Sequence, residues 1–98
     1  MRAGSFFIRI KLLMLKFTLY SRSYCHLCED MALALKALLG DLPYDLEITD
    51  VDADPALVEK YDELVPVLTG YSVNNGWQQL CHYHLDAKAV AAFVQEQS

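Results

Sequence analysis

The sequence lacks a block of basic residues, a long hydrophobic segment and an even number of cysteines. Its net charge of −5 repels phosphate groups, so nucleic acid is not an expected partner. A membrane-spanning helix needs roughly 20 apolar residues, and no stretch approaches that length, so a membrane is not an expected partner either. Because three cysteines do not make a disulfide-stapled secreted domain, we expect a cytoplasmic location.

Repeats and low-complexity segments are also absent, and 98 residues are enough for only one small domain. Hydrophobic residues make up 54% of the chain and charged residues 21%, which favours a compact core over disorder. Basic residues interrupt the apolar run within residues 1–14, unlike the core of a signal peptide. We therefore expect an extension over residues 1–14 and one domain over residues 15–98, with Met14 as an alternative start.

The most informative feature that is present is the cysteine pair in Cys25-His26-Leu27-Cys28. It lies between the apolar run of residues 15–20 and a helical pattern, so the two sulfurs can form a small disulfide ring. The first sulfur would lie at a helix N-terminus, where free N–H groups and the helix dipole favour an anion. Because the thiolate is the reacting species, this location would activate Cys25. Taken alone, such a pair is also typical of half a zinc site.

Hydrophobic periodicity predicts an α/β domain with the element order β-α-β-α-β-β-α. Strands are expected over residues 15–20, 44–51, 65–68 and 77–82, and helices beginning at residues 27, 55 and 87. Gly40 should end the first helix, while Asp54 and Asp86 should cap the next two. Asn75-Gly76 predicts a hairpin turn. A parallel pair joined through a helix, followed by this hairpin, gives a mixed four-stranded sheet with helices packed on it.

Four stretches of the chain resemble the glutaredoxin branch of the thioredoxin superfamily. They are Leu19-Tyr20-Ser21, Cys25-His26-Leu27-Cys28, Val65-Pro66 and Asn74-Asn75-Gly76. The resemblance runs from about residue 15 to the C-terminus and is greatest to short bacterial glutaredoxin-like proteins with a Cys-His-Leu-Cys pair. It implies a thioredoxin/glutaredoxin-like three-layer α/β/α sandwich. It also implies a thiol–disulfide oxidoreductase, acting on protein or small-molecule disulfides without a metal or organic cofactor.

The resemblance also implies roles for individual residues. Cys25 would be the attacking thiol and Cys28 the resolving thiol. Pro66 would be a cis-proline that faces the pair, and the backbone of Val65 would bind an extended substrate. His26 could supply a positive charge beside the thiolate, or it could be an exposed loop histidine without a role.

The stretch before the last helix departs from glutathione-using glutaredoxins, which carry a Gly-Gly-containing turn there. Residues 81–86 read CHYHLD, and only Asp86 matches. His26 also replaces the proline that these proteins have within the pair. Because a glycine-rich turn lets backbone N–H groups approach a carboxylate closely, its loss predicts weak glutathione binding. Asp86 remains a candidate for substrate binding beside the N-terminus of the last helix.

Two other functions remain open from the sequence. Cys81, His82 and His84 could complete a zinc site with the pair, but Cys81 would point away from both histidines if all three lie on a strand. We therefore expect no metal site, a buried Cys81 that acts as a small hydrophobic residue, and solvated histidines. The second alternative is a binding module that keeps the fold but has little turnover and recruits a partner through Val65.

Overall fold

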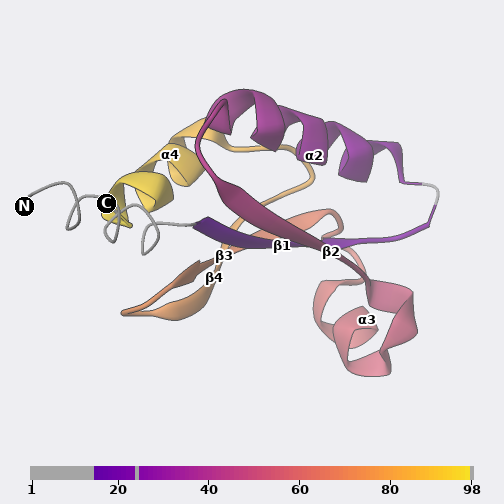
Figure 1. Ribbon diagram of the computed structural model, residues 1–98. Helices are drawn as coiled ribbons and strands as arrows, with labels where there is room; N and C mark the ends of the chain where they lie inside the picture. The colour runs from indigo at the N-terminus through magenta and orange to yellow at the C-terminus, as the bar shows by residue number, and fades with distance from the viewer. Residues whose placement is uncertain (1–14, 24, 98) are drawn as a thin grey trace, which may run out of the picture.

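The computed structural model describes residues 15–23 and 25–97, which form a mixed four-stranded sheet with helices on both faces (Figure 1). The strands are β1 (Leu15–Ser21), β2 (Tyr44–Asp50), β3 (Val67–Ser72) and β4 (Gly76–His82). The helices are α2 (His26–Leu39), α3 (Pro55–Tyr61) and α4 (Ala87–Glu96), with a 3-10 turn, η1 (Val51–Ala53), before α3. The expected extension over residues 1–14, with Met14 as an alternative start, lies outside the described residues.

The predicted caps Gly40, Asp54 and Asp86 are all found, and only the start of α2 differs, at His26 instead of residue 27. Helix α2 ends at Gly40, whose φ of 58° suits glycine and whose N–H donates to the carbonyl of Lys36. The carboxylate of Asp54 accepts the N–H of Ala56 at 2.9 Å, with Pro55 as the first residue of α3. Asp86 likewise caps α4. These local predictions are therefore confirmed.

The sheet has the strand order β2-β1-β3-β4. Strands β1 and β2 are parallel, whereas β3 is antiparallel to both β1 and β4. The predicted parallel pair, hairpin and α/β sandwich are confirmed. The first strand extends one residue further than predicted, to Ser21, and the fourth begins one residue earlier, at Gly76. The bounds predicted for the third strand were wrong: it runs from Val67 to Ser72 and begins after Pro66, which has no N–H for the ladder. The second ends at Asp50, whose carboxylate accepts the N–H of Asp52 and caps η1.

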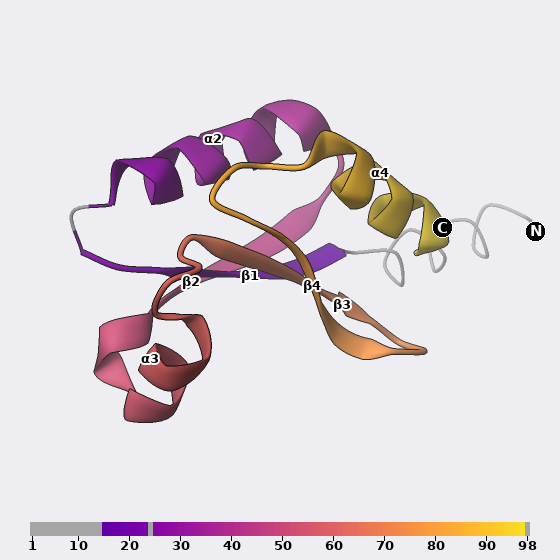
Figure 2. The same ribbon diagram turned by 180° about the vertical axis from the view of Figure 1, so that it is seen from behind.

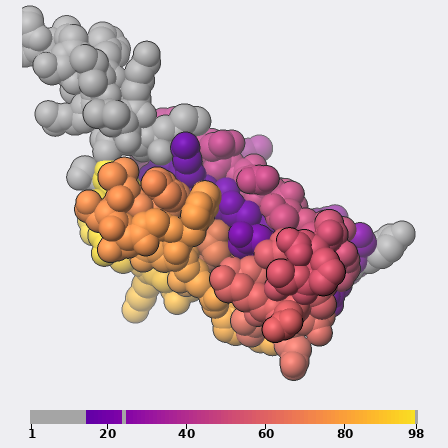
Figure 3. All heavy atoms as spheres, turned by 90° about the horizontal axis from the view of Figure 1, so that it is seen from below, coloured from indigo at the N-terminus to yellow at the C-terminus, as the bar shows by residue number. Residues whose placement is uncertain are grey.

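Helices α2 and α4 cover one face of the sheet, and α3 covers one end of the other (Figures 1 and 2). Figure 3 shows the second face, where atoms of β1 remain visible between the β3–β4 hairpin and α3. The main core lies under α2 and α4. It comprises Leu15, Phe17, Leu19, Met31, Leu35, Leu39, Leu68, Cys81, Val90 and Phe93. A smaller core of Val51, Tyr61 and Val67 lies under α3. The three layers therefore match the predicted sandwich.

At the edge of the main core, some of the apolar residues in the helical and strand patterns are exposed. On α2, Met31, Leu35 and Leu39 are buried, whereas the apolar Leu27 and Leu38 are exposed at its margin. On the outer strand β2, Leu46 packs against the core, but Ile48 is 59% exposed. The sheet therefore presents an uncovered apolar side chain near the start of α2. Within the described residues, the helices are all too short or too polar to span a bilayer.

Candidate redox site

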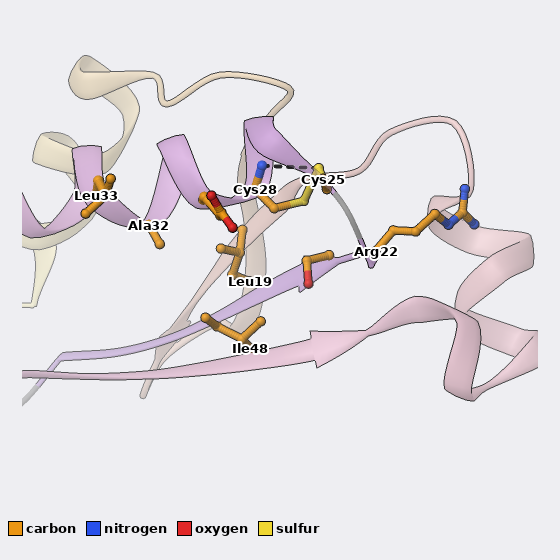
Figure 4. A pocket seen from close by; sticks show the side chains of 9 residues that line it. Leu19, Arg22, Cys25, Cys28, Ala32, Leu33 and Ile48 are labelled. Atoms are coloured by element: carbon orange, nitrogen blue, oxygen red, sulfur yellow. Dashed lines mark hydrogen bonds between the residues drawn. A yellow bond between two sulfur atoms is a disulfide. The ribbon is translucent and has the colours of Figure 1, made fainter.

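The two cysteines of the pair form a disulfide at the first turn of α2 (Figure 4). Cys25 is the N-cap residue, and its Sγ accepts the backbone N–H of Cys28 at 3.1 Å. The Cα atoms are 5.3 Å apart, within the usual range for a disulfide. Cys28 is buried, whereas Cys25 is partly exposed. The predicted ring, and its place at a helix N-terminus, are therefore confirmed.

This local geometry favours a thiolate on Cys25 once the disulfide is reduced. The N–H of Cys28 points at the sulfur, and the dipole of the 14-residue helix places partial positive charge there. Glu29 in the first turn is an exposed carboxylate that opposes this effect. His26 is the exposed first residue of α2. That His26 places a positive charge beside the Cys25 thiolate stays a prediction.

A cavity of about 440 Å³ opens beside the disulfide, between α2 and the strands β1 and β2. Figure 4 shows Leu19 and Ile48 extending from the strands towards α2, with the sulfurs at one end. The cavity is lined by Leu19, Ser21, Arg22, Cys25, Cys28, Glu29, Ala32, Leu33 and Ile48. A molecule in this cavity would therefore touch the disulfide. Sequence reasoning did not anticipate it.

The peptide bond between Val65 and Pro66 is cis, as the resemblance predicted. Pro66 is buried and Val65 is partly exposed, just before β3. Val65 packs against the small core of Val51, Tyr61 and Val67. That Pro66 faces the sulfurs and that the backbone of Val65 binds substrate stay predictions.

Tyr83 holds the segment that ends in this cis bond, a role that sequence reasoning missed. Its N–H donates to the carbonyl of Pro66 at 2.9 Å, and its hydroxyl donates to the carbonyl of Glu63. Its φ is 65°, which is uncommon for a residue other than glycine. In the sequence, Tyr83 shows only as part of the CHYHLD stretch that departs from the glycine turn. It fixes residues 63–66 against the end of β4.

Tyr83→Phe is expected to lower the free energy of unfolding by about 0.5–1.5 kcal/mol, because it removes one hydrogen bond and keeps the ring. It should also raise the KM for a peptide disulfide if residues 63–66 bind substrate. Urea unfolding and steady-state kinetics measure the two effects. His84→Ala, at a neighbouring exposed residue, is the matched control. An unchanged unfolding free energy in Tyr83→Phe would show that the hydroxyl does not hold the segment.

Arg22 joins the loop before the pair to α3 and η1, and it too was missed from the sequence. Its Nε donates to Asp52 at 3.1 Å and its Nη2 donates to Asp62 at 2.6 Å. The hydrogen bond to Asp62, followed by that to Asp52, raises the pKa of the Arg22 guanidinium. Because all three side chains are solvent-accessible, the contribution to stability is small. The consequence is that both carboxylates offset the positive charge of Arg22.

The remaining candidate residues lie around the end of β4. Cys81 is buried in the main core, as predicted, and burial raises the pKa of its thiol. His82 and His84 are exposed, also as predicted. Asp86 caps α4, and its role in substrate binding stays a prediction. Among residues 15–23 and 25–97, no three His, Cys, Asp or Glu side chains are grouped to hold a metal ion.

These positions predict the order in which the reduced protein reacts with iodoacetamide. Cys25 should be alkylated first, because it is the most accessible thiol and lies at the N-terminus of α2. Cys81 should react slowly at neutral pH, since the residue is only 8% exposed and the pKa of its thiol is raised by burial. Peptide mapping by mass spectrometry at successive times measures the order. Labelling of Cys28 before Cys25 would overturn the assignment of the attacking thiol.

A redox-type Cys-x-x-C disulfide at the start of a helix, on a mixed four-stranded sheet, defines a protein of the thioredoxin-fold class. The family model "Glutaredoxin-like domain (DUF836)" matches residues 16–95, and the chain belongs to this family. The family resemblance seen in the sequence is therefore confirmed. A search of the curated proteins gives no match.

Solved structures agree with this assignment. The solution structure of protein Ne2328 from Nitrosomonas europaea is 36% identical, with a TM-score of 0.71 over 82% of this chain and 91% of that one. Protein XcR50 from X. campestris is 28% identical, with a TM-score of 0.59 over 82% and 96% of the two chains. Mitochondrial thioredoxin 3 from Saccharomyces cerevisiae is 14% identical, with a TM-score of 0.60 over 96% and 89%. This last likeness shows the fold alone.

Proposed function

We propose that the protein is a thiol–disulfide oxidoreductase that reduces disulfides with the Cys25–Cys28 dithiol. The observation that carries the proposal is the position of Cys25 Sγ. It caps α2, accepts the N–H of Cys28 and borders an open cavity. A buried structural pair would have no need of such access. The reacting sulfur therefore has both a stabilised thiolate and room for a substrate.

The reaction transfers two electrons from the pair to the substrate disulfide. The Cys25 thiolate attacks one substrate sulfur, forms a mixed disulfide and expels the other sulfur as a thiolate, which takes up a proton. Cys28 then loses its proton and attacks Cys25 Sγ, which releases the second substrate sulfur as a thiolate that is also protonated. The products are two substrate thiols and the Cys25–Cys28 disulfide. An external dithiol must reduce the pair before the next cycle.

The geometry of the first turn supports the second step. The Cα atoms of the two cysteines are 5.3 Å apart in the disulfide, so the helical first turn of α2 accommodates the closed ring. Cys28 is 6% exposed, which keeps external disulfides away from it. Cys25 can thus meet the substrate first while Cys28 is reserved for resolution.

Reduction of insulin in the presence of dithiothreitol tests the proposal. The wild-type protein should accelerate precipitation of the insulin chains well above the rate with dithiothreitol alone. Cys81→Ala is the matched control, because it removes the free thiol of the core and leaves the pair intact. It should keep the wild-type rate once its folding has been verified. A wild-type rate equal to the background would instead favour a binding module with little turnover.

The proposed substrates are protein or small-molecule disulfides, and the proposed location is the cytoplasm. No metal or organic cofactor takes part in the two displacement steps. A protein dithiol is the proposed reductant, because the stretch from Cys81 to Asp86 lacks the glycine turn of glutathione-using relatives.

Glutathione should therefore turn the enzyme over slowly. Tyr83, at a φ of 65°, and its exposed histidine neighbours place side chains where a glycine turn would expose backbone N–H groups. The net charge of −5 adds a modest repulsion of an anionic ligand. Steady-state reduction of a mixed glutathione disulfide, beside an ordinary dithiol glutaredoxin, measures the difference. Equal rates would show that the missing glycines do not matter.

A further inference from the structure

The cavity beside Cys25 lies on the side of the pair that faces β2, and neither Val65 nor Pro66 lines it. Its walls come from β1, the loop before α2, α2 itself and β2 (Figure 4). The resemblance to glutaredoxins assigns substrate binding to Val65 and Pro66 instead. The cavity is thus separate from the substrate site expected at Val65 and Pro66. Both sites would adjoin Cys25 Sγ.

The chemistry of the walls is mainly apolar. Leu33 on α2 is 65% exposed and Ile48 on β2 is 59% exposed, although both are large hydrophobic residues. They lie with Leu19 and Ala32 around a volume of about 440 Å³, which is suited to one or two apolar side chains. Exposed apolar residues that line a cavity together indicate a binding surface rather than chance exposure.

The charges around the cavity are mainly negative. Glu29 lines it, and Asp50, an exposed carboxylate, follows Ile48 by two residues and so lies on the same face of β2, the outer strand that forms one wall. Arg22 is the cationic residue of the lining, but Asp52 and Asp62 offset its charge. A substrate that approaches along β2 therefore meets an anionic surface, which favours a cationic partner.

We infer that the substrate is a polypeptide disulfide whose cysteine has an apolar neighbour and is flanked by basic residues. The apolar side chain occupies the cavity between Leu33 and Ile48, and the basic side chains lie against the carboxylates of Glu29 and Asp50. Since β2 is the outer strand of the described sheet, its free edge suits an extended polypeptide. The inference rests on the proposed function. It uses the same two displacements, in which Cys25 Sγ bonds to the substrate sulfur beside the cavity.

The test compares three synthetic disulfide-linked peptides with hydroxyethyl disulfide, a small uncharged substrate. The first peptide carries leucine and two lysines beside its cysteine, the second glycine and two lysines, and the third leucine and two glutamates. The wild-type kcat/KM for the first peptide should exceed those for the other two by about tenfold, as expected for the loss of one apolar contact or a reversal of charge. The advantage over the glutamate peptide should shrink at high salt.

Single substitutions test which residues of the protein cause the preference for the leucine–lysine peptide. Ile48→Ser and Leu33→Ser should each lower the ratio of kcat/KM for the leucine–lysine peptide to that for hydroxyethyl disulfide by about tenfold. Glu29→Gln should reduce the preference for lysine over glutamate, whereas Glu47→Gln, on the opposite face of β2, should keep it. Val73→Ser, at an exposed apolar residue of the β3–β4 turn, is the matched control and should keep both ratios.

Equal kcat/KM values for the three peptides, with turnover of hydroxyethyl disulfide retained, would overturn this inference alone. An unchanged ratio in both Ile48→Ser and Leu33→Ser would do the same. Absence of turnover on the peptides and on hydroxyethyl disulfide would overturn the proposed function and this inference with it.

Discussion

Cys28→Ser is expected to stop the reaction at a mixed disulfide between Cys25 and the substrate. The serine hydroxyl cannot displace the bound thiol at neutral pH, so the intermediate should accumulate to one substrate per protein molecule. Cys25→Ser should abolish turnover altogether, because the remaining thiol of the pair is buried and lies inside the first turn of α2. Both variants should therefore lose multiple turnover, but only Cys28→Ser should trap the mixed disulfide with the substrate.

Intact-mass measurement under non-reducing conditions detects the trapped adduct, and dithiothreitol should remove it. Cys81→Ala combined with Cys28→Ser is the matched control, since it excludes an adduct on the third thiol. An adduct in Cys25→Ser but not in Cys28→Ser would reverse the roles of the two cysteines. An adduct in neither variant would exclude attack by a single thiol of the pair.

Leu35→Ala is expected to give the largest loss of stability among single truncations on α2. Leu35 is fully buried at the centre of the main core, and the change leaves a cavity under the helix. The expected loss is about 2–5 kcal/mol, a large part of the roughly 5–15 kcal/mol typical of a domain. In urea denaturation, the loss should appear as a lower midpoint concentration of urea with an unchanged m-value.

Leu33→Ala is the matched control, because it makes the same chemical change two residues away on the same helix. Leu33 is 65% exposed, so its truncation should change the unfolding free energy by no more than about 0.5 kcal/mol. Similar losses in the two variants would mean that α2 does not pack on the sheet through the face that contains Leu35.

The features that the sequence predicted correctly are set by residues close together in the chain. Asp54 and Asp86 each bond to an N–H two or three residues ahead, and Gly40 and Gly76 adopt positive φ values at a helix end and a turn. The Cys25–Cys28 ring likewise needs only one helical turn. Such signals depend on local geometry and survive in any tertiary context.

The features that were missed depend on strand order and long-range contacts. Arg22 meets Asp62 across 40 positions, and Tyr83 meets Glu63 across 20. The exposure of Ile48 follows from the position of β2 at the edge of the sheet, which periodicity within one strand does not reveal. The cavity depends on both strand order and long-range contacts, because it lies where α2, β1 and the outer strand β2 meet.

Whether the Cys25–Cys28 pair itself reduces a substrate disulfide is measured by a single-turnover electron balance. The fully reduced protein, freed of other reductants, is mixed with an equal amount of a disulfide peptide, and thiols are counted on both partners over time. Two substrate thiols should appear while the protein loses two hydrogen atoms and gains the Cys25–Cys28 disulfide, located by peptide mapping. A protein that binds the peptide but keeps both thiols reduced would contradict the assignment of an oxidoreductase.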